Sequence, residues 1–396
     1  MSMIYLNQLG MISPLGNTLD ETKRSLLELA QSGVAFSDAY SPGRPLPLGR
    51  VDPCLVLPPM DRWPLPDRSR NNQLALAALK QIRPAAERAI ECFGAARVGV
   101  VIGTSTSGVG EAETALRDYV STGALPMRFH YGQQELASAA TVLATELGIT
   151  GPAYVHSSAC ASSAKALASA ARLIRMNACD AMIAGGVDTL CRFTVAGFAA
   201  LESISRTRCN PLSRNRDGIN IGEGASLFLV SREPATVRLR GWGESSDGYH
   251  MSAPDPAGAG ARLALEQALA RAAVTAAEIE YVNLHGTATV HNDAMEAELI
   301  YQVIGDRVCV SSTKPFTGHA LGAAGAIEAG VCWLAMQDDN VTGKLPPHLW
   351  DGIGDPKLPV LQLAAPTTRL GHPPRLALSN SFAFGGANVT LVFARD

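Results

Sequence analysis

Apolar and polar positions along the chain alternate between the spacing typical of strands and that typical of helices. Continuous apolar runs begin near residues 97, 153 and 180, and each leads into a turn of glycine, serine or threonine. Such runs are typical of strands that are buried on both faces of a sheet. Segments 165–175 and 320–336 instead carry apolar residues at the spacing of buried helices. This alternation predicts an α/β fold.

The same order of elements begins again near Val237. VRLRGWGESS has the pattern of the opening strand, IEYVNLHGTAT that of RVGVVIGTST, and RVCVSSTKPFTGHALGAAG that of the strand, turn and helix around Cys160. The closing segment, RLALSNSFAFGGANVTLVFARD, supplies two further strands. We therefore predict two similar halves, residues 1–236 and 237–396, packed around a shared core.

Composition and charge narrow the classes of function. The 396 residues are 47% hydrophobic, and 33 basic residues nearly balance 36 acidic ones, which gives no support for binding nucleic acid or an anionic membrane. The apolar run 320–336 is interrupted by Glu328 and is too short for a comfortable membrane span. Eight scattered cysteines without a CxxC pair, and a start without the features of a signal peptide, lead us to expect a cytoplasmic protein.

Cys160, in the segment VHSSACASS, is the candidate nucleophile. It follows the strand-like residues 153–155 and stands at or near the first turn of a buried helix. Unpaired N–H groups and the positive end of a helix dipole lower the pKa of a thiol at such a place and can hold an oxyanion. A free cysteine is also commonly just a small buried apolar residue, so Cys160 alone does not define a site.

Two histidines in the second half supply the groups that a nucleophilic cysteine needs. His285 lies in LHGTAT at the end of a buried strand, and His319 lies in STKPFTGHALGAAG at the start of a buried helix, five residues after Lys314. One cysteine and two histidines, each at a glycine-marked end of an element, favour a nucleophilic site. Metal binding is the alternative use of these residue types, but the chain has no HExxH or CxxC pattern, so we predict no metal.

Five motifs follow one another along the chain. They are SSACASS around Cys160, NPLSRNRDGINIGEGA from Asn210, HGTAT with NDAMEAE from His285, STKPFTGHALGAAGAIE from Ser312, and NSFAFGGAN from Asn380. In this order they resemble the elongating β-ketoacyl-(acyl carrier protein) synthases, which are thiolase-fold condensing enzymes, and the likeness covers essentially the whole chain.

The resemblance implies a fold, a partner and a mode of substrate delivery. The expected fold is thiolase-like, with two duplicated α/β halves that form a layered αβαβα core. The expected partners are an acyl carrier protein and a second chain, either an identical copy or a related condensing-enzyme chain. Substrates would arrive on the phosphopantetheine arm of the carrier protein, so no cofactor is expected.

The same resemblance assigns the central roles. Cys160 would hold the acyl chain as a thioester, while His285 and His319 would donate hydrogen bonds to the malonyl carbonyl as carbon dioxide leaves. Two donors aimed at the growing enolate charge stabilise it more than they stabilise the ground state. Backbone N–H groups of Cys160 and Phe384 would hold the tetrahedral oxyanion.

A supporting network and a substrate channel are also implied by the resemblance. Lys314 would position His319 and Glu296. The residues carried over for substrate binding are Thr287 and Thr289 for the pantetheine arm, and Phe384, Phe198 and Thr106 for the gate and wall of the acyl pocket. Turn chemistry explains a threonine equally well, and core packing a phenylalanine.

Three positions depart from the family's pattern. Ala383 stands where the family usually has a glycine, and Thr106 where many relatives place an aliphatic residue. These two departures favour an unusual acyl chain, polar or unsaturated, and a specialised polyene or polyketide pathway. Glu202 stands near Phe198, where carrier-dependent relatives often have a basic residue, which weakens the argument for docking there.

The predicted activity is a decarboxylative Claisen condensation of malonyl-(acyl carrier protein) with the acyl chain on Cys160. A thiolase would need a second cysteine in the final glycine turn, and a starter-type condensing enzyme would be expected to carry asparagine in place of His319. The alternative is a non-catalytic, chain-length-determining subunit of a heterodimer. Such subunits usually lose the nucleophile, which this chain keeps.

Overall fold

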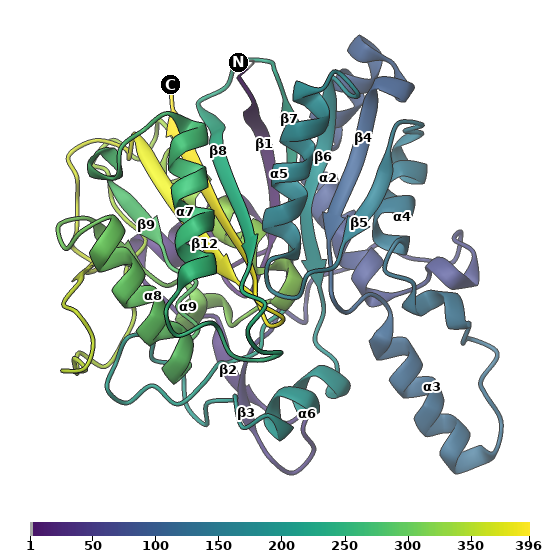
Figure 1. Ribbon diagram of the computed structural model, residues 1–396. Coiled ribbons are helices and arrows are strands. Elements are labelled where there is room, and N and C mark those ends of the chain that lie inside the picture. Colours follow the sequence, from purple (N-terminus) through teal and green to yellow (C-terminus); the bar gives the residue numbers. More distant parts are fainter. Residues whose placement is uncertain (1–2) are drawn as a thin grey trace.

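The computed structural model describes residues 3–396, which form one large mixed sheet, a small hairpin and the helices that cover them (Figure 1). The strands are β1 (Tyr5–Ile12), β2 (Val34–Ser37), β3 (Leu46–Gly49), β4 (Val98–Gly103), β5 (Ala153–His156), β6 (Ala181–Asp188), β7 (Gly224–Ser231), β8 (Val237–Ser246), β9 (Tyr281–Asn283), β10 (Cys309–Ser311), β11 (Gln362–Leu363), β12 (Leu376–Phe382) and β13 (Ala387–Arg395).

The helices are α1 (Leu19–Lys23), α2 (Arg70–Phe93), α3 (Val109–Thr122), α4 (Ser138–Leu147), α5 (Ser162–Arg175), α6 (Arg192–Ala200), α7 (Ala259–Ala272), α8 (Val290–Val303), α9 (Lys314–Thr317) and α10 (Ala324–Ala335). A π-helical turn, Arg24–Glu28, continues α1, and short 3-10 turns span Leu65–Asp67, Ala95–Arg97, Tyr131–Gln134, Ala276–Glu278 and Leu321–Ala323. Among residues 3–396, no helix combines the length and the apolar character that crossing a bilayer requires.

The large sheet shows the duplication directly. The described residues place its strands in the order β11-β10-β9-β12-β13-β8-β1-β7-β6-β4-β5. Read outward from the centre, β1-β7-β6-β4-β5 in the first half corresponds to β8-β13-β12-β9-β10 in the second, with the same parallel and antiparallel pairings. One residue pair, Tyr5 with Arg238, joins the halves at β1 and β8. The expected thiolase-like arrangement is confirmed; the division between residues 236 and 237 falls between β7 and β8 and stays a prediction.

Two buried helices form the middle layer between the halves. α5 and α10 share one apolar cluster with residues of both sets of strands, while α2 and α4 cover the outer face of the first half and α7 and α8 that of the second. The two middle helices approach closely because small residues face each other. A Cβ at Gly325 would lie 2.9 Å from the Cβ of Ala164, so a larger side chain there would separate the helices.

This packing fixes the turns that leave one end of the sheet. β4 and β6 of the first half, and β9 and β12 of the second, all point their carboxyl ends toward the same region (Figure 1). Ligands of α/β folds bind beside such strand ends, where loops rather than strands present their side chains. α6 and the hairpin of β2 and β3 lie below this end, and α3 projects away from the body beside it (Figure 1).

Candidate active site

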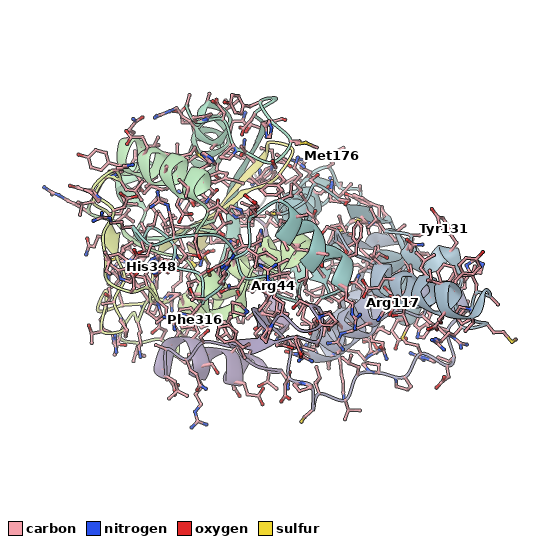
Figure 2. The ribbon with its side chains drawn as sticks, turned by 90° about the horizontal axis from the view of Figure 1, so that it is seen from below. Arg44, Arg117, Tyr131, Met176, Phe316 and His348 are labelled. Atoms are coloured by element: carbon pink, nitrogen blue, oxygen red, sulfur yellow. The ribbon has the colours of Figure 1, made fainter. Side chains whose placement is uncertain are left out.

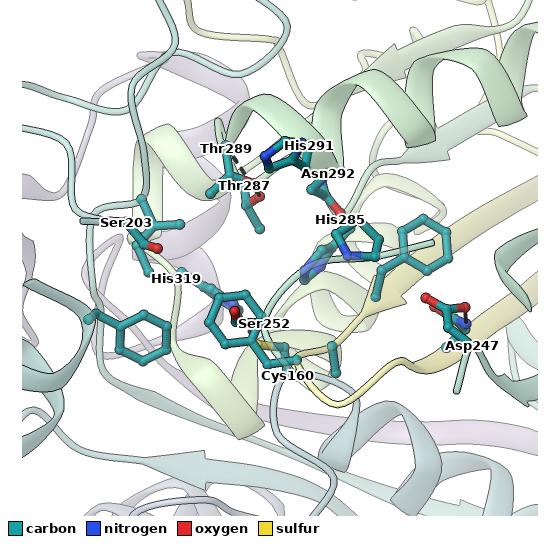
Figure 3. A pocket seen from close by; sticks show the side chains of 17 residues that line it. Cys160, Ser203, Asp247, Ser252, His285, Thr287, Thr289, His291, Asn292 and His319 are labelled. Atoms are coloured by element: carbon teal, nitrogen blue, oxygen red, sulfur yellow. Dashed lines mark hydrogen bonds between the residues drawn. The ribbon is translucent and has the colours of Figure 1, made fainter. Parts of the chain in front are cut away.

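Cys160 lies in a tight turn between β5 and α5. Ala159, just before it, has a positive φ of 46°, a backbone conformation that costs a non-glycine residue roughly 1–3 kcal/mol. The Ser162 hydroxyl holds this turn, since it accepts a hydrogen bond from the Ser158 N–H at 2.8 Å and donates one to the Ala159 carbonyl at 2.6 Å. The turn presents the Cys160 thiol, which is 5% exposed, at the bottom of a cavity (Figure 3).

The two predicted histidines meet this thiol. The Nε2 atom of His319 lies 2.9 Å from Cys160 Sγ, and the rings of His285 and His319 stand edge to face with centroids 5.4 Å apart. His319 is held like a strand residue, because its N–H donates to the Asn220 carbonyl and its own carbonyl accepts from the Gly222 N–H. The structure therefore brings Cys160, His285 and His319 together across the two halves, as predicted (Figure 3).

Burial controls the protonation of this trio. Burial raises the pKa of the Cys160 thiol to about 12, although the charge of Lys314 and a hydrogen bond from the Phe384 N–H both lower it. The expected low thiol pKa is wrong here because desolvation outweighs the helix terminus. Burial also lowers the pKa of His285 and of His319 well below the usual value, with Lys314 adding to the effect. A neutral thiol thus faces a neutral imidazole that can accept its proton.

Lys314 does not make the contacts predicted for it. Its ammonium group donates to the His285 carbonyl, pairs with Glu328 and lies 3.3 Å from His285 Nδ1, whereas the described residues show no hydrogen bond from it to His319 or Glu296. Because an ammonium group only donates, His285 Nδ1 must accept, which leaves the ring proton on Nε2. Lys314 therefore sets the tautomer of His285.

Glu296 holds the same histidine from its backbone side. Its carboxylate accepts the N–H of His285 at 2.8 Å and that of Gly286 at 2.7 Å, together with the Asn380 side-chain amide at 3.2 Å. Burial raises the pKa of Glu296 to about 7, against the effect of these hydrogen bonds. Glu296 and Lys314 thus support His285 separately, rather than forming the single network that we expected.

The cavity above Cys160 has an aromatic wall and a polar mouth. It encloses about 680 Å³, including its open mouth, and its lining contains Phe198 and Phe384 as well as Thr287 and Thr289. The two phenylalanine rings lie with centroids 5.6 Å apart. The threonine hydroxyls are 3.0 Å from each other near the mouth, beyond the histidines (Figure 3). The position of the two phenylalanines is compatible with a gate of the acyl pocket, and that of the two threonines with binding of the pantetheine arm. Both roles stay predictions.

Thr106 turns away from this cavity and is not among its described lining residues. Its hydroxyl donates to Asp188 at 2.7 Å and accepts from the Thr189 N–H at 3.2 Å. A buried carboxylate therefore binds the Thr106 hydroxyl, and the role of Thr106 in lining the acyl pocket stays a prediction.

Asp188 is the prominent buried group that the sequence analysis missed. It is fully buried and accepts hydrogen bonds from the hydroxyls of residues 104–106, from the N–H groups of Ser105 and Thr106, and from the Gly322 N–H. A carboxylate at a strand end, opposite a turn of four consecutive hydroxyl residues, was the signal that could have found it. Asp247, Ser252 and Asn292, which line the cavity mouth, had no comparable signal (Figure 3).

Cys160, His285 and His319 have the spacing of metal ligands. Cys160 Sγ and one nitrogen of each histidine lie within 4.8 Å of one another. A cation there would be opposed by the ammonium group of Lys314, 3.3 Å from His285 Nδ1. The prediction that the trio works without a metal therefore stays in place.

Fold and site together define a condensing enzyme of thiolase-like fold. The family descriptions "Beta-ketoacyl synthase, N-terminal domain" and "Beta-ketoacyl synthase, C-terminal domain" match residues 68–235 and 236–349. The chain is 31% identical to 3-oxoacyl-[acyl-carrier-protein] synthase 2 of Vibrio cholerae over 99% of both chains, and 33% identical to nodulation protein E of Rhizobium meliloti over 84% of both. The chain belongs to the β-ketoacyl synthase family, whose members are acyltransferases.

Solved structures agree with this assignment. A ketosynthase (ApeO) in complex with its chain length factor (ApeC) from Xenorhabdus doucetiae matches all of this chain and 98% of that one, with a TM-score of 0.93 and 42% identity. The ishigamide ketosynthase/chain length factor matches all of this chain and 99% of that one, with a TM-score of 0.87 and 25% identity.

Proposed function

We propose that this chain condenses a malonyl group, delivered on an acyl carrier protein, with an acyl chain held as a thioester on Cys160. The observation that carries the proposal is the contact of 2.9 Å between Cys160 Sγ and His319 Nε2, with His285 facing the same cavity. The products of one cycle would be a β-ketoacyl thioester two carbons longer, carbon dioxide and a free Cys160 thiol.

In the first half-reaction the acyl chain moves onto Cys160. His319 Nε2 accepts the thiol proton, the sulfur attacks the thioester carbon, and the N–H groups of Cys160 and Phe384 hold the oxyanion. The pantetheine sulfur leaves and takes the proton from His319, so charge and protons balance. Because burial raises the pKa of the Cys160 thiol, the thiol loses its proton only to a base in contact with it, which is His319.

In the second half-reaction the malonyl group loses carbon dioxide. His285 presents Nε2–H because Lys314 occupies its Nδ1 side, and this donor faces the oxygen that becomes negative in the enolate. His319 Nδ1 has no hydrogen-bond partner among residues 3–396, so neither tautomer of that ring is locked. His319 can therefore accept a proton in the first step and donate to the enolate in the second. The enolate carbon then attacks the Cys160 thioester and expels the Cys160 thiolate, which takes up one proton from solvent by way of His319 to restore the thiol.

Intact mass spectrometry of the protein tests this function. Mixed with acyl carrier proteins that bear chains of different length, the wild-type protein should gain an acyl adduct, and Cys160→Ala should gain none. Adding malonyl-(acyl carrier protein) should remove the adduct and yield a longer product. His285→Ala should keep the adduct but lose malonyl decarboxylation, and undiminished condensation in that variant would refute the role given to His285.

A second chain of the same fold is proposed as partner, and a related condensing-enzyme chain is favoured over an identical copy. Two of the similar solved structures are ketosynthases with chain length factors. We call α3 and the residues that follow it, up to Tyr131, the α3 arm. On this arm the side chain of Val120 is 86% exposed and that of Met127 is 98% exposed, and Tyr131 lies on the same projection (Figure 2). Apolar side chains so exposed are typical of an interface. Val120→Asp should abolish any dimer seen by light scattering, and co-expression with a related chain should recover a heterodimer only for the wild type.

The alternative function, a non-catalytic partner subunit, is less well supported because the reacting trio is complete and in contact. Failure of every acyl donor to form an adduct would favour that alternative. We also propose the cytoplasm as location, since all eight cysteines are free and the reacting thiol must stay reduced.

The similarity to a ketosynthase that works with a chain length factor favours a specialised pathway over housekeeping fatty-acid synthesis. The acyl-donor panel tests this choice as well, since a preference for unsaturated chains over saturated ones would support it.

A further inference from the structure

The α3 arm is joined to the body by two carboxylates near its start, Glu111 in the first turn of α3 and Glu113 just after it. α3 buries Ala112 and Ala115 and otherwise projects from the molecule (Figure 1). Glu111 accepts the Arg70 N–H at the start of α2, at 2.7 Å. Glu113 reaches the start of another helix, α6. Each carboxylate therefore attaches the arm to the amino end of a different helix.

Glu113 satisfies the first free N–H groups of α6 with both of its oxygens. One oxygen accepts the Arg192 N–H at 3.1 Å, and the other accepts the Phe193 N–H at 2.8 Å. The first N–H groups of a helix have no partner within it, and a negative charge is favourable at its positive end. The Cys191 side chain accepts the Thr194 N–H, and Glu113 completes this cap by satisfying the two N–H groups that precede it.

α6 has few other attachments to the body. Val195 is its buried residue, and Phe198, one turn later, packs partly buried against the cluster that contains Ile219 and Leu321. The ring of Phe198 lies 5.6 Å from that of Phe384 and lines the cavity above Cys160. Phe198 is the seventh of the nine residues of α6 and lies less than two turns from the N–H groups of Arg192 and Phe193 that Glu113 binds.

We propose that Glu113 is a positioning residue for the acyl pocket: it caps α6 and thereby holds Phe198 against Phe384. The proposal rests on the proposed function, since it takes the cavity beside Phe198 as the space for the acyl chain. It also connects the projecting arm, where we place the partner chain, with the pocket. Loss of the cap frees Phe198 and widens the pocket for long chains.

Glu113→Ala and Glu111→Ala form a matched pair, because each removes from the start of α3 a carboxylate that binds the first N–H groups of another helix. The rate of Cys160 acylation is measured by intact mass with a short and a long acyl carrier protein thioester. In Glu113→Ala the ratio of the long-chain to the short-chain rate should rise about fivefold, which corresponds to a helix cap worth about 1 kcal/mol. In Glu111→Ala the ratio should stay at the wild-type value.

A double-mutant cycle separates positioning from general destabilisation. If Glu113 acts through Phe198, then adding Glu113→Ala to Phe198→Ala leaves the ratio unchanged. An equal change in both backgrounds would overturn the proposal. Glu113→Gln keeps an acceptor oxygen and should restore at least part of the wild-type ratio, and it serves as the test protein if Glu113→Ala does not fold.

The outcomes distinguish this inference from the function on which it rests. No adduct on the wild-type protein with any donor contradicts the proposed function. A wild-type adduct with the same chain-length ratio in Glu113→Ala contradicts the role of Glu113 alone.

Discussion

The turns after β4 and β9 occupy equivalent places in the two halves, but only the second carries a reacting side chain. In the first half, residues 104–106 direct their hydroxyls, and Ser105 and Thr106 also their N–H groups, to the buried carboxylate of Asp188. In the second half, the N–H groups of His285 and Gly286 end on the buried carboxylate of Glu296, and the imidazole points into the cavity. Each turn is therefore held by a carboxylate.

The two turns differ in whether their side chains are used to bind the carboxylate. Around Asp188 the hydroxyls of residues 104–106 all bind the carboxylate, so none of these side chains is left to act on a substrate. Around Glu296 the backbone alone supplies the hydrogen bonds to the carboxylate from the turn, which leaves the His285 ring free for Lys314 on one side and for substrate on the other. Both turns are thus held by a carboxylate, and the reacting side chain, His285, is in the turn that is held through its backbone alone.

Removing the side-chain partner of His285 should have the largest effect. In Lys314→Met, His285 loses the partner that sets its tautomer, and we expect malonyl decarboxylation to fall about 100- to 1,000-fold. The variant also leaves Glu328 buried without its partner, which costs about 3–5 kcal/mol of unfolding free energy. Carbon dioxide release measures the first effect and chemical denaturation the second.

A double variant separates these two effects. Lys314→Met with Glu328→Leu removes both charges, so stability should return while decarboxylation stays low. Lys357→Met, at an exposed position, is the control for loss of a positive charge. Decarboxylation that recovers together with stability would show that Lys314 serves the fold and not His285.

Sequence patterns could predict the reacting trio but not its supports. Cys160, His285 and His319 lie in short turns with local motifs, so their positions follow from the order of strands and helices. The partners of Lys314 depend on where α10 places Glu328, which no local pattern shows. The direction of Thr106 depends likewise on Asp188, 82 residues later. The raised pKa of Cys160 required the depth of its burial, which emerges only when both halves are packed.

The first half should respond in stability rather than in chemistry. Asp188→Ala leaves buried N–H and hydroxyl donors without an acceptor, and we expect a loss of about 3 kcal/mol or more, since a single unsatisfied group costs about 1–3 kcal/mol. Decarboxylation per folded molecule should stay near the wild-type value, because pairing with Asn220 and Gly222 holds His319 independently. Denaturation curves measure the stability and carbon dioxide release measures the decarboxylation, both on the same samples.

Asp188→Asn retains an acceptor oxygen and should lose less stability than Asp188→Ala. If either variant lowered decarboxylation as strongly as Lys314→Met does, the two carboxylate-held turns would not differ in the way described here.

The prediction with the smallest consequence for activity and stability concerns the pH dependence of the Cys160 thiol. Because burial raises its pKa to about 12, the thiolate fraction should increase about tenfold per pH unit from pH 7 to beyond pH 10. An ordinary thiol stops gaining near pH 8.5. Peptide mass spectrometry after iodoacetamide treatment should therefore show Cys160 labelling still rising at pH 10, with the exposed Cys54 and Cys92 as internal references for the reagent. Labelling of Cys160 that is already fast and constant from pH 6 would contradict this prediction. It would mean that His319 holds the proton and that Cys160 is a thiolate before substrate binds.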